Sequence, residues 1–266
     1  MTTTMLGRSA PSTRTEATLR VVAPVAVGVL VLGFWQFLVS VVGVSDYLLP
    51  SPAAIVGQFV AFLPSMVSAT AVTGINSLLG LVIGSLLGIL IAALAAGWRP
   101  VDQMSAPIVA SLAVIPIVAL APVLNSMFGA DSQFGRQAIA GLASFVPVFI
   151  NTLRGFRQTL PVHRDLMKVY AASSSQIVRT VTLPTAIPFI FTGIRIASSL
   201  AVISALVAEY FGGPRGGLGG LISTSAASSA YPRAWAYVVA SIALGLIFYL
   251  ATLALERLAS RGRQRT

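Results

Sequence analysis

Few residues in this chain are of a type that performs chemistry, and they are too scattered to form an enzyme site. The single histidine is His163, the single lysine is Lys168, and there is no cysteine. No Gly-x4-Gly-Lys-Ser/Thr phosphate-binding loop is present, and no nucleophile is accompanied by a base and an orienting group. One histidine without a second ligand nearby argues against a metal site. The sequence therefore predicts a protein that is not an enzyme and binds no cofactor or metal itself.

Two charged residues, Arg195 and Glu209, fall inside one long apolar stretch. A charge in hydrocarbon costs at least about 2.5–3.5 kcal/mol, so such residues usually face a bundle interior or water and mark a solute pathway. On a helix they would stand about 21 Å apart in height, with Ser198 and Ser199 near the inner one. Two interpretations stay open: these four residues line a pathway, or the two charges reach the membrane interfaces from the helix ends.

Composition indicates that the whole chain is an integral membrane protein. Of its 266 residues, 56% are hydrophobic and only 9% are charged, whereas soluble domains carry about 25% charged residues. The net charge of +10 does not indicate nucleic-acid binding, because the basic residues occur in short clusters beside apolar stretches. We therefore expect a lipid environment and no nucleic-acid partner.

Six apolar segments are long enough to cross a bilayer core of about 30 Å as helices. They cover residues 21–43, 68–97, 104–128, 137–153, 189–211 and 234–256. Lys and Arg favour cytoplasmic loops, and most of the 17 basic residues lie on the inner side if both termini are cytoplasmic. The predicted organisation is a disordered cytoplasmic tail (1–20), a transmembrane domain (21–256) and a basic cytoplasmic tail (257–266) in the cytoplasmic membrane, with outer loops at 45–67, 129–136 and 212–233.

Three features inside the transmembrane domain suggest how the helices pack. Small residues recur every fourth position in the second segment, a spacing that lets helices approach closely within one subunit or across a homodimer. Prolines interrupt the third segment, which predicts kinks that either line a pathway or serve packing alone. The outer loop 45–67 has the pattern of an amphipathic interfacial helix. The small residues are Gly80, Gly84 and Gly88, and the prolines are Pro107, Pro116 and Pro122.

A polar loop of about 157–188 separates the fourth and fifth segments, and its pattern predicts two short helices. Pro161 suits a first helical turn, and Leu166, Val169 and Tyr170 then give one apolar edge at helical spacing. Ser173 followed by Gln176 is a capping-box pattern that starts a second helix. Leu183-Pro184 is predicted to end it. The loop is either a docking surface for a partner or a plain connector, and an exposed apolar edge favours docking.

This loop resembles the cytoplasmic signature loop of binding-protein-dependent ABC importer permeases, especially the nitrate, sulfonate, taurine and pyrimidine-precursor branch. Val181-Thr182-Leu183-Pro184 matches the end of the family pattern, and Asp165 stands at its first position, where the family has Glu. The chain departs from the pattern at Ala171, where the family has Gly, and at Leu166-Met167, where it has Ala-Ala. Further similarity extends over nearly the whole chain, at residues 47–52, 115–116, 145–147, 193–195, 208–209 and 217–219.

The resemblance implies an all-α type I ABC importer permease fold with about six transmembrane helices and a cytoplasmic coupling-helix loop. It implies three protein partners: an ATPase subunit that binds ATP and Mg²⁺, an extracytoplasmic solute-binding protein and a second permease subunit, expected as a homodimer. The solute would be of the nitrate, sulfonate or taurine type, or of the pyrimidine or riboflavin type. The alternative is an ion-gradient-driven secondary transporter or channel, for which Glu209 would be the candidate coupling group. The residues expected to dock the ATPase are Arg164, Asp165, Leu166, Lys168, Val169, Tyr170, Ala171, Ser173, Gln176, Ile177 and Arg179.

Overall fold

The computed structural model describes residues 13–129, 132–212 and 216–261, and within them every regular element is helical. The predicted all-α architecture is thereby confirmed. In chain order the elements are α1 (Thr13–Ser40), α2 (Pro52–Ala61), α3 (Leu63–Gly97), α4 (Arg99–Ala113), α5 (Ile117–Phe128), α6 (Phe134–Arg157), α7 (Pro161–Val169), α8 (Ser174–Ile177), the π-helical turn η1 (Val178–Thr182), α9 (Leu183–Phe211), α10 (Leu218–Ala227) and α11 (Tyr231–Arg261).

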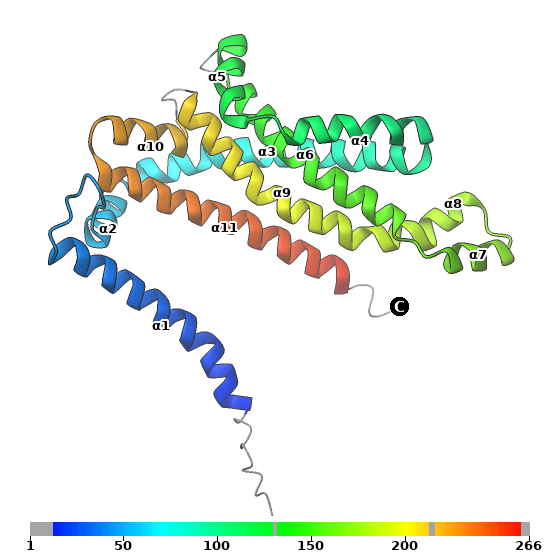
Figure 1. Ribbon diagram of the computed structural model, residues 1–266, viewed down its shortest axis with the longest axis horizontal. Coiled ribbons are helices and arrows are strands. Elements are labelled where there is room, and N and C mark those ends of the chain that lie inside the picture. The colour runs from blue at the N-terminus through cyan, green and yellow to red at the C-terminus, as the bar shows by residue number, and fades with distance from the viewer. Residues whose placement is uncertain (1–12, 130–131, 213–215, 262–266) are drawn as a thin grey trace, which may run out of the picture.

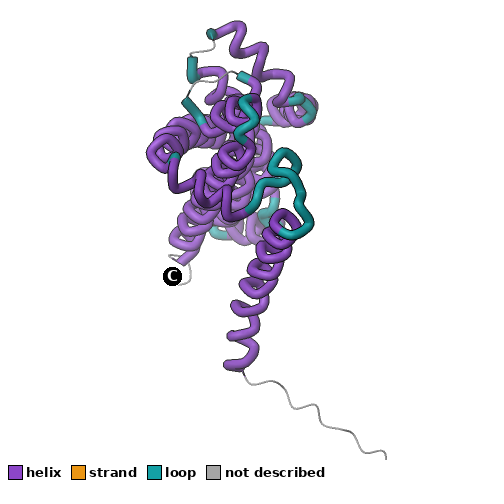
Figure 2. Tube along the Cα trace, turned by 90° about the vertical axis from the view of Figure 1, so that its left-hand side faces the viewer, coloured by secondary structure: helices purple, strands orange, loops and turns teal. Residues whose placement is uncertain are grey.

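Long helices packed side by side form the body of the molecule. α3, α6 and α9 make the closest contacts, and α11 lies along α9 (Figure 1). The short helices α2 and α10 lie at one end of this bundle, whereas α7 and α8 project from the opposite end. α1 leaves the bundle beside α2 and projects away from the other helices (Figure 2). No residue in the apolar part of α1, Val22–Ser40, is buried by the rest of this chain.

The close contact between α3 and α6 depends on the small residues predicted from their spacing. A Cβ added at Gly80 would come within 2.5 Å of Ala140 Cβ, one at Gly84 would overlap Gly141 O, and one at Gly88 would lie 3.0 Å from Phe145 O. All three glycines therefore face α6 of the same chain. This geometry is packing within one subunit, the first of the two alternatives that the spacing left open.

The third predicted span is broken into two helices. α4 and α5 are inclined to each other by 96°, so the described residues contain five straight candidate spans and a sixth only if this bent pair counts as one. The break lies at Val114–Pro116, because Pro116 has no N–H to continue the helix. Pro107 and Pro122 lie inside α4 and α5. Thus one of the three prolines breaks the span, not all three.

Several boundaries differ from those predicted. α1 begins at Thr13, inside the segment expected as a disordered tail, and α11 continues to Arg261 through part of the expected basic tail. Residues 1–12 and 262–266 of those two tails lie outside the described part of the chain. The outer segment 45–67 forms only the ten-residue α2 before α3 starts at Leu63. The outer loop 212–233 contains α10, which hydropathy alone did not indicate because it is too short to span.

The prediction that Leu183-Pro184 ends a helix is wrong. Residues 174–211 form one continuous helical stretch, in which η1 joins α8 to α9. The Pro184 ring would clash with the carbonyl four residues earlier in a regular α-helix. The π-turn avoids this arrangement, and the Leu183 N–H bonds to Val178 O, five residues back. The second short helix of the loop is therefore rigidly continuous with the span that follows it.

Candidate functional site

The polar loop folds into what we call the α7–α8 surface, residues 161–177. α7 ends in a Schellman-type turn, in which Ala171 N–H bonds to Lys168 O at 2.9 Å and Ala172 N–H bonds to Met167 O at 3.0 Å. Ala171 adopts a left-handed conformation with φ of 51°. That conformation costs an L-residue about 1–2 kcal/mol, which explains why glycine occupies this position in the signature that the loop resembles.

α8 begins with the predicted capping box. The Ser173 side chain accepts a hydrogen bond from Gln176 N–H at 3.4 Å, and Gln176 Oε1 accepts one from Ser173 N–H at 2.7 Å. Ile177 is half-buried and, together with Phe156 of α6, lines a depression with a volume of 490 Å³. The start of α8 is thus fixed by its own cap and by contact with the bundle.

The apolar edge of α7 points into solvent. Leu166 is 53% exposed, Val169 82% and Tyr170 74%. Polar groups lie on the same helix: Lys168 Nζ lies 2.9 Å from Asp165 Oδ1 in an exposed ion pair. Arg179 is also exposed, on η1. The Arg164 side chain lies outside the described part. An exposed apolar edge beside polar groups is typical of a protein-binding surface.

Arg195 and the neighbouring serines belong to the contact between α9 and α11. Arg195 Nη1 lies 2.9 Å from Glu256 Oε2, with the two side chains 28% and 23% exposed. The buried Ser198 hydroxyl donates to Arg195 O at 2.7 Å and lies 3.3 Å from Thr252 Oγ1. Sequence reasoning did not find Glu256 as the partner, because 61 residues separate it from Arg195 and no spacing rule connects two different spans.

Ser199 is half-buried and lines a depression of 330 Å³ between α9, α10 and α11. It therefore lies on the same side of α9 as α11, in a depression that Arg195 and Glu209 do not line.

Glu209 is buried inside the bundle, with 1% of its surface exposed. Its Oε2 accepts hydrogen bonds from Thr73 Oγ1 at 2.8 Å and from the N–H of Gly219 at 3.1 Å. Thr73 Oγ1 in turn accepts from Leu218 N–H at 2.9 Å. Gly217 lies directly against the carboxylate, where a Cβ would overlap it. Glu209 thus holds the first turn of α10 against α3 and α9, near the end of α9 at Phe211.

A buried polar cluster continues from Glu209 to α6. Arg136, expected in an outer loop, is only 1% exposed and donates to Gln133 Oε1 at 2.9 Å. It also interacts electrostatically with the Glu209 carboxylate. Asn76 of α3 donates to the same Gln133 oxygen at 2.8 Å and accepts from Gln137 Nε2 at 3.1 Å. No sequence pattern pointed to this cluster, because its members come from three separate segments.

A family model for the inner membrane component of binding-protein-dependent transport systems matches residues 84–261. The chain belongs to this family. The matched region contains the α7–α8 surface and the helices on both sides of it. Membership establishes a permease component of an ABC importer, embedded in a membrane by several helices.

Individual relatives agree with this assignment. The riboflavin transport system permease protein RibX of Chloroflexus aurantiacus is 31% identical over 87% of each chain. The formylaminopyrimidine transport permease protein ThiX of Halalkalibacterium halodurans is 30% identical over 70% of this permease and 74% of its own length. A crystal structure of an amino acid ABC transporter with histidines superimposes with a TM-score of 0.57 at 18% identity, covering 78% of this chain and 96% of that one. This last likeness shows the fold.

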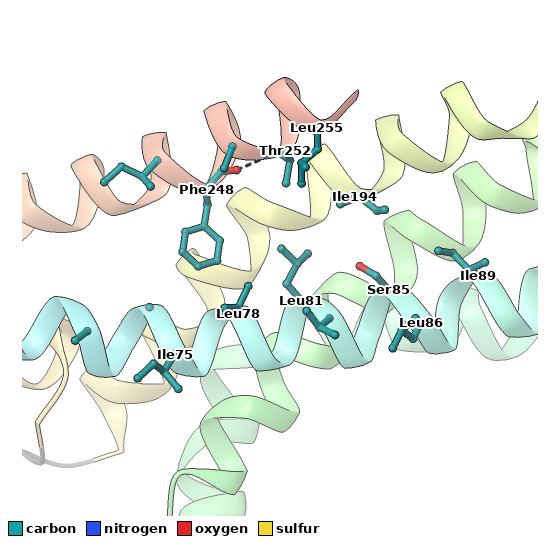
Figure 3. Close-up of a pocket in the computed structure, with 15 residues that line it drawn as sticks. Ile75, Leu78, Leu81, Ser85, Leu86, Ile89, Ile194, Phe248, Thr252 and Leu255 are labelled. Carbon is teal, nitrogen blue, oxygen red and sulfur yellow. Dashed lines mark hydrogen bonds between the residues drawn. The ribbon is translucent and has the colours of Figure 1, made fainter. Parts of the chain in front are cut away.

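Two grooves on the permease differ in chemical character. The Phe248 groove has a volume of 590 Å³ between α3, α9 and α11, and Phe248 of α11 points toward α3 there (Figure 3). Apart from Ser85 and Thr252, its lining is apolar, and none of the predicted pathway residues lines it. The Gln137 groove has a volume of 490 Å³ and is lined by Ile83 and Leu87 of α3, Leu112 of α4, and Phe134, Gln137 and Phe145 of α6, with Gly84 and Gly141 beside them.

Groups of acidic or histidine side chains able to hold a metal are absent from the described residues. The residues of the permease that stand out by geometry are therefore the exposed edge of α7, the α9–α11 ion pair, the buried Glu209 cluster and the Gln137 groove.

Proposed function

We propose that this permease is the non-catalytic translocation subunit of an ATP-driven importer in the cytoplasmic membrane, and that its ATPase subunit docks on the α7–α8 surface. Both termini are cytoplasmic in this proposal. A solute-binding protein delivers the solute from outside, and a second copy of the chain completes the pathway. ATP and Mg²⁺ bind to the ATPase subunit, since this chain has no phosphate-binding loop.

The observation that carries the proposal is the exposure of Leu166, Val169 and Tyr170 on α7, the short helix that precedes α8. Large apolar side chains in water are unfavourable, and burial in a partner groove would remove them from it. Because α8 continues through η1 into α9, a displacement of α8 by the ATPase would move that span as a rigid body. This continuity supports the coupling of ATPase closure to the membrane helices.

The solute belongs to one of two groups that similar importers carry. The first group is nitrate, sulfonates and taurine, and the second is pyrimidine and riboflavin compounds. The relatives named for riboflavin and formylaminopyrimidine transport support the second group. A gradient-driven transporter or channel is the alternative, and uptake that persists without ATP would favour it.

Substitution of Tyr170 by aspartate tests the docking. Tyr170→Asp would place an unpaired charge in the contact, which costs about 3–5 kcal/mol, so the ATPase should no longer copurify and uptake should stop. Tyr47 is the matched control, since it is 69% exposed at the other end of the molecule. Tyr47→Asp should leave ATPase copurification unchanged. Normal copurification and uptake with Tyr170→Asp would refute the docking surface.

A further inference from the structure

We infer that the Gln137 groove is where the permease contacts its solute, and that the solute is an uncharged, planar heteroaromatic molecule. The inference rests on the proposed function and makes it more specific. It also differs from the pathway predicted at Arg195, Ser198, Ser199 and Glu209, so one set of measurements separates the two locations.

The first support is the position of the break in the third span. Leu112 lines the groove, and the irregular residues Val114–Pro116 follow it closely. Non-helical backbone at membrane depth is tolerated only where protein buries it or where it lines a water-filled cavity. This chain does not bury it, because Val114 is 77% exposed. A water-containing space beside the groove, or cover by the second copy of the chain that completes the proposed pathway, satisfies that requirement, whereas contact with lipid chains does not.

The second support is the side chain of Gln137. Its Nε2 donates to Asn76 Oδ1 at 3.1 Å, and no hydrogen bond from another described residue reaches its Oε1. Asn76 is itself held by Gln133, so Gln137 has a fixed orientation at the groove wall. An amide acceptor that is fixed in this way and not used by the protein suits a ligand N–H or O–H.

The third support is the chemistry of the remaining wall. Phe134 and Phe145 stand about three turns apart on α6. Gly84 and Gly141 contribute only backbone to the same wall, because their Cβ directions lead into the contact between α3 and α6. Aromatic edges beside a flat backbone surface favour a planar ring. A single amide among apolar residues then provides orientation, as in sites for small heteroaromatic ligands.

The absence of charge in the wall argues against an anionic solute. No residue that lines the groove in the described part of the chain is charged. Arg136 is adjacent to Gln137 in sequence, yet it is buried and directed to Gln133 and the Glu209 cluster. An anion such as a sulfonate would therefore lose its hydration without gaining a partner of opposite charge. An uncharged ring system loses much less hydration free energy when it enters the groove.

A cysteine introduced at Ala138 provides the test, because the chain has no native cysteine and Ala138 lines the groove next to Gln137. Ala138→Cys, in membranes that contain the complete permease–ATPase complex, is treated with a small water-soluble thiol reagent. Riboflavin, cytosine and taurine are each added as protecting probes. We expect labelling of the introduced thiol to be slowed at least threefold by riboflavin or cytosine and to be unaffected by taurine.

Two further variants sharpen the result. Gln137→Leu, combined with Ala138→Cys, should weaken protection by about threefold to tenfold, the effect of one lost hydrogen bond. Gln103→Leu, an exposed glutamine on α4, should have no effect. Ala251→Cys in the Phe248 groove should react slowly, with no protection by any probe.

The inference is overturned if the Ala138→Cys variant does not react, if neither riboflavin nor cytosine protects it, or if taurine protects it equally. Ready labelling and protection of Ser199→Cys, with none of Ala138→Cys, would instead return the pathway to α9. These outcomes are independent of ATPase docking, because Tyr170→Asp should abolish copurification of the ATPase without changing the labelling of Ala138→Cys.

Discussion

The ion pair between Arg195 and Glu256 yields a quantitative prediction, because it joins the two candidate spans α9 and α11. The paired atoms are 2.9 Å apart and about a quarter of each side chain is exposed. Removal of one partner of a buried pair costs about 3–5 kcal/mol, and insertion of a charge in a membrane helix costs about 2.5–3.5 kcal/mol. Allowing for the exposed fraction, we expect Arg195→Met and Glu256→Gln each to cost about 2–3 kcal/mol.

The free energy of unfolding of the double variant Arg195→Met/Glu256→Gln should lie within about 1 kcal/mol of that of the original protein, because both charges of the pair are removed together. At about 2–4 °C per kcal/mol, each single variant should lower Tm by about 4–12 °C, and the double variant should recover most of that loss. The Tm of the purified complex is measured by size-exclusion chromatography after heating. Solute uptake by the same variants is measured in parallel.

Additive losses of Tm in the double variant would refute the reasoning that the pair holds α9 to α11. A double variant that is stable but has no uptake would indicate that Arg195 acts on the solute, as the interpretation of Arg195 as a pathway residue predicts. Recovery of both stability and uptake is the result expected from the structure.

Two other predictions concern helix packing and topology. Gly80→Leu should destabilise the permease by at least about 1–3 kcal/mol, because its side chain would overlap Ala140 of α6, whereas Gly245→Leu, which has open space around it, should be nearly neutral in the same thermal assay. In intact cells an impermeant thiol reagent should label Ser45→Cys but not Ser173→Cys, and labelling of Ser173→Cys before permeabilisation would contradict a cytoplasmic α7–α8 surface.

Features determined by local sequence were predictable. The apolar segments indicated the spans, and the Ser173–Gln176 spacing indicated the capping box, because hydropathy and helix caps depend on neighbouring residues. Ala171 was recognised as a departure from the family pattern, and its positive φ explains why the family has glycine at this position. The glycine spacing also predicted close packing, although only the structure shows that α6 is the partner.

Features that depend on tertiary contacts were not predictable. Nothing near Arg195 in sequence indicated Glu256, and nothing near Glu209 indicated Thr73 or the first turn of α10. The six-span topology placed Arg136 in the outer loop 129–136, and nothing in the sequence indicated that the cluster around Glu209 buries it within the helical bundle. Likewise, proline predicts local disruption but not its form: Pro116 breaks a span, Pro184 is accommodated by a π-turn, and Pro107 remains within a helix.

Docking of an ATPase that powers this permease through the α7–α8 surface is tested most directly by crosslinking. Val169→Cys, at a position that is 82% exposed in the isolated chain, is combined with single cysteines in the groove of the coexpressed ATPase, and disulfide formation is followed with and without ATP. We predict a crosslink at Val169→Cys that blocks ATP-dependent uptake until it is reduced. Absence of any crosslink there, together with uptake that continues without ATP, would contradict the proposed coupling.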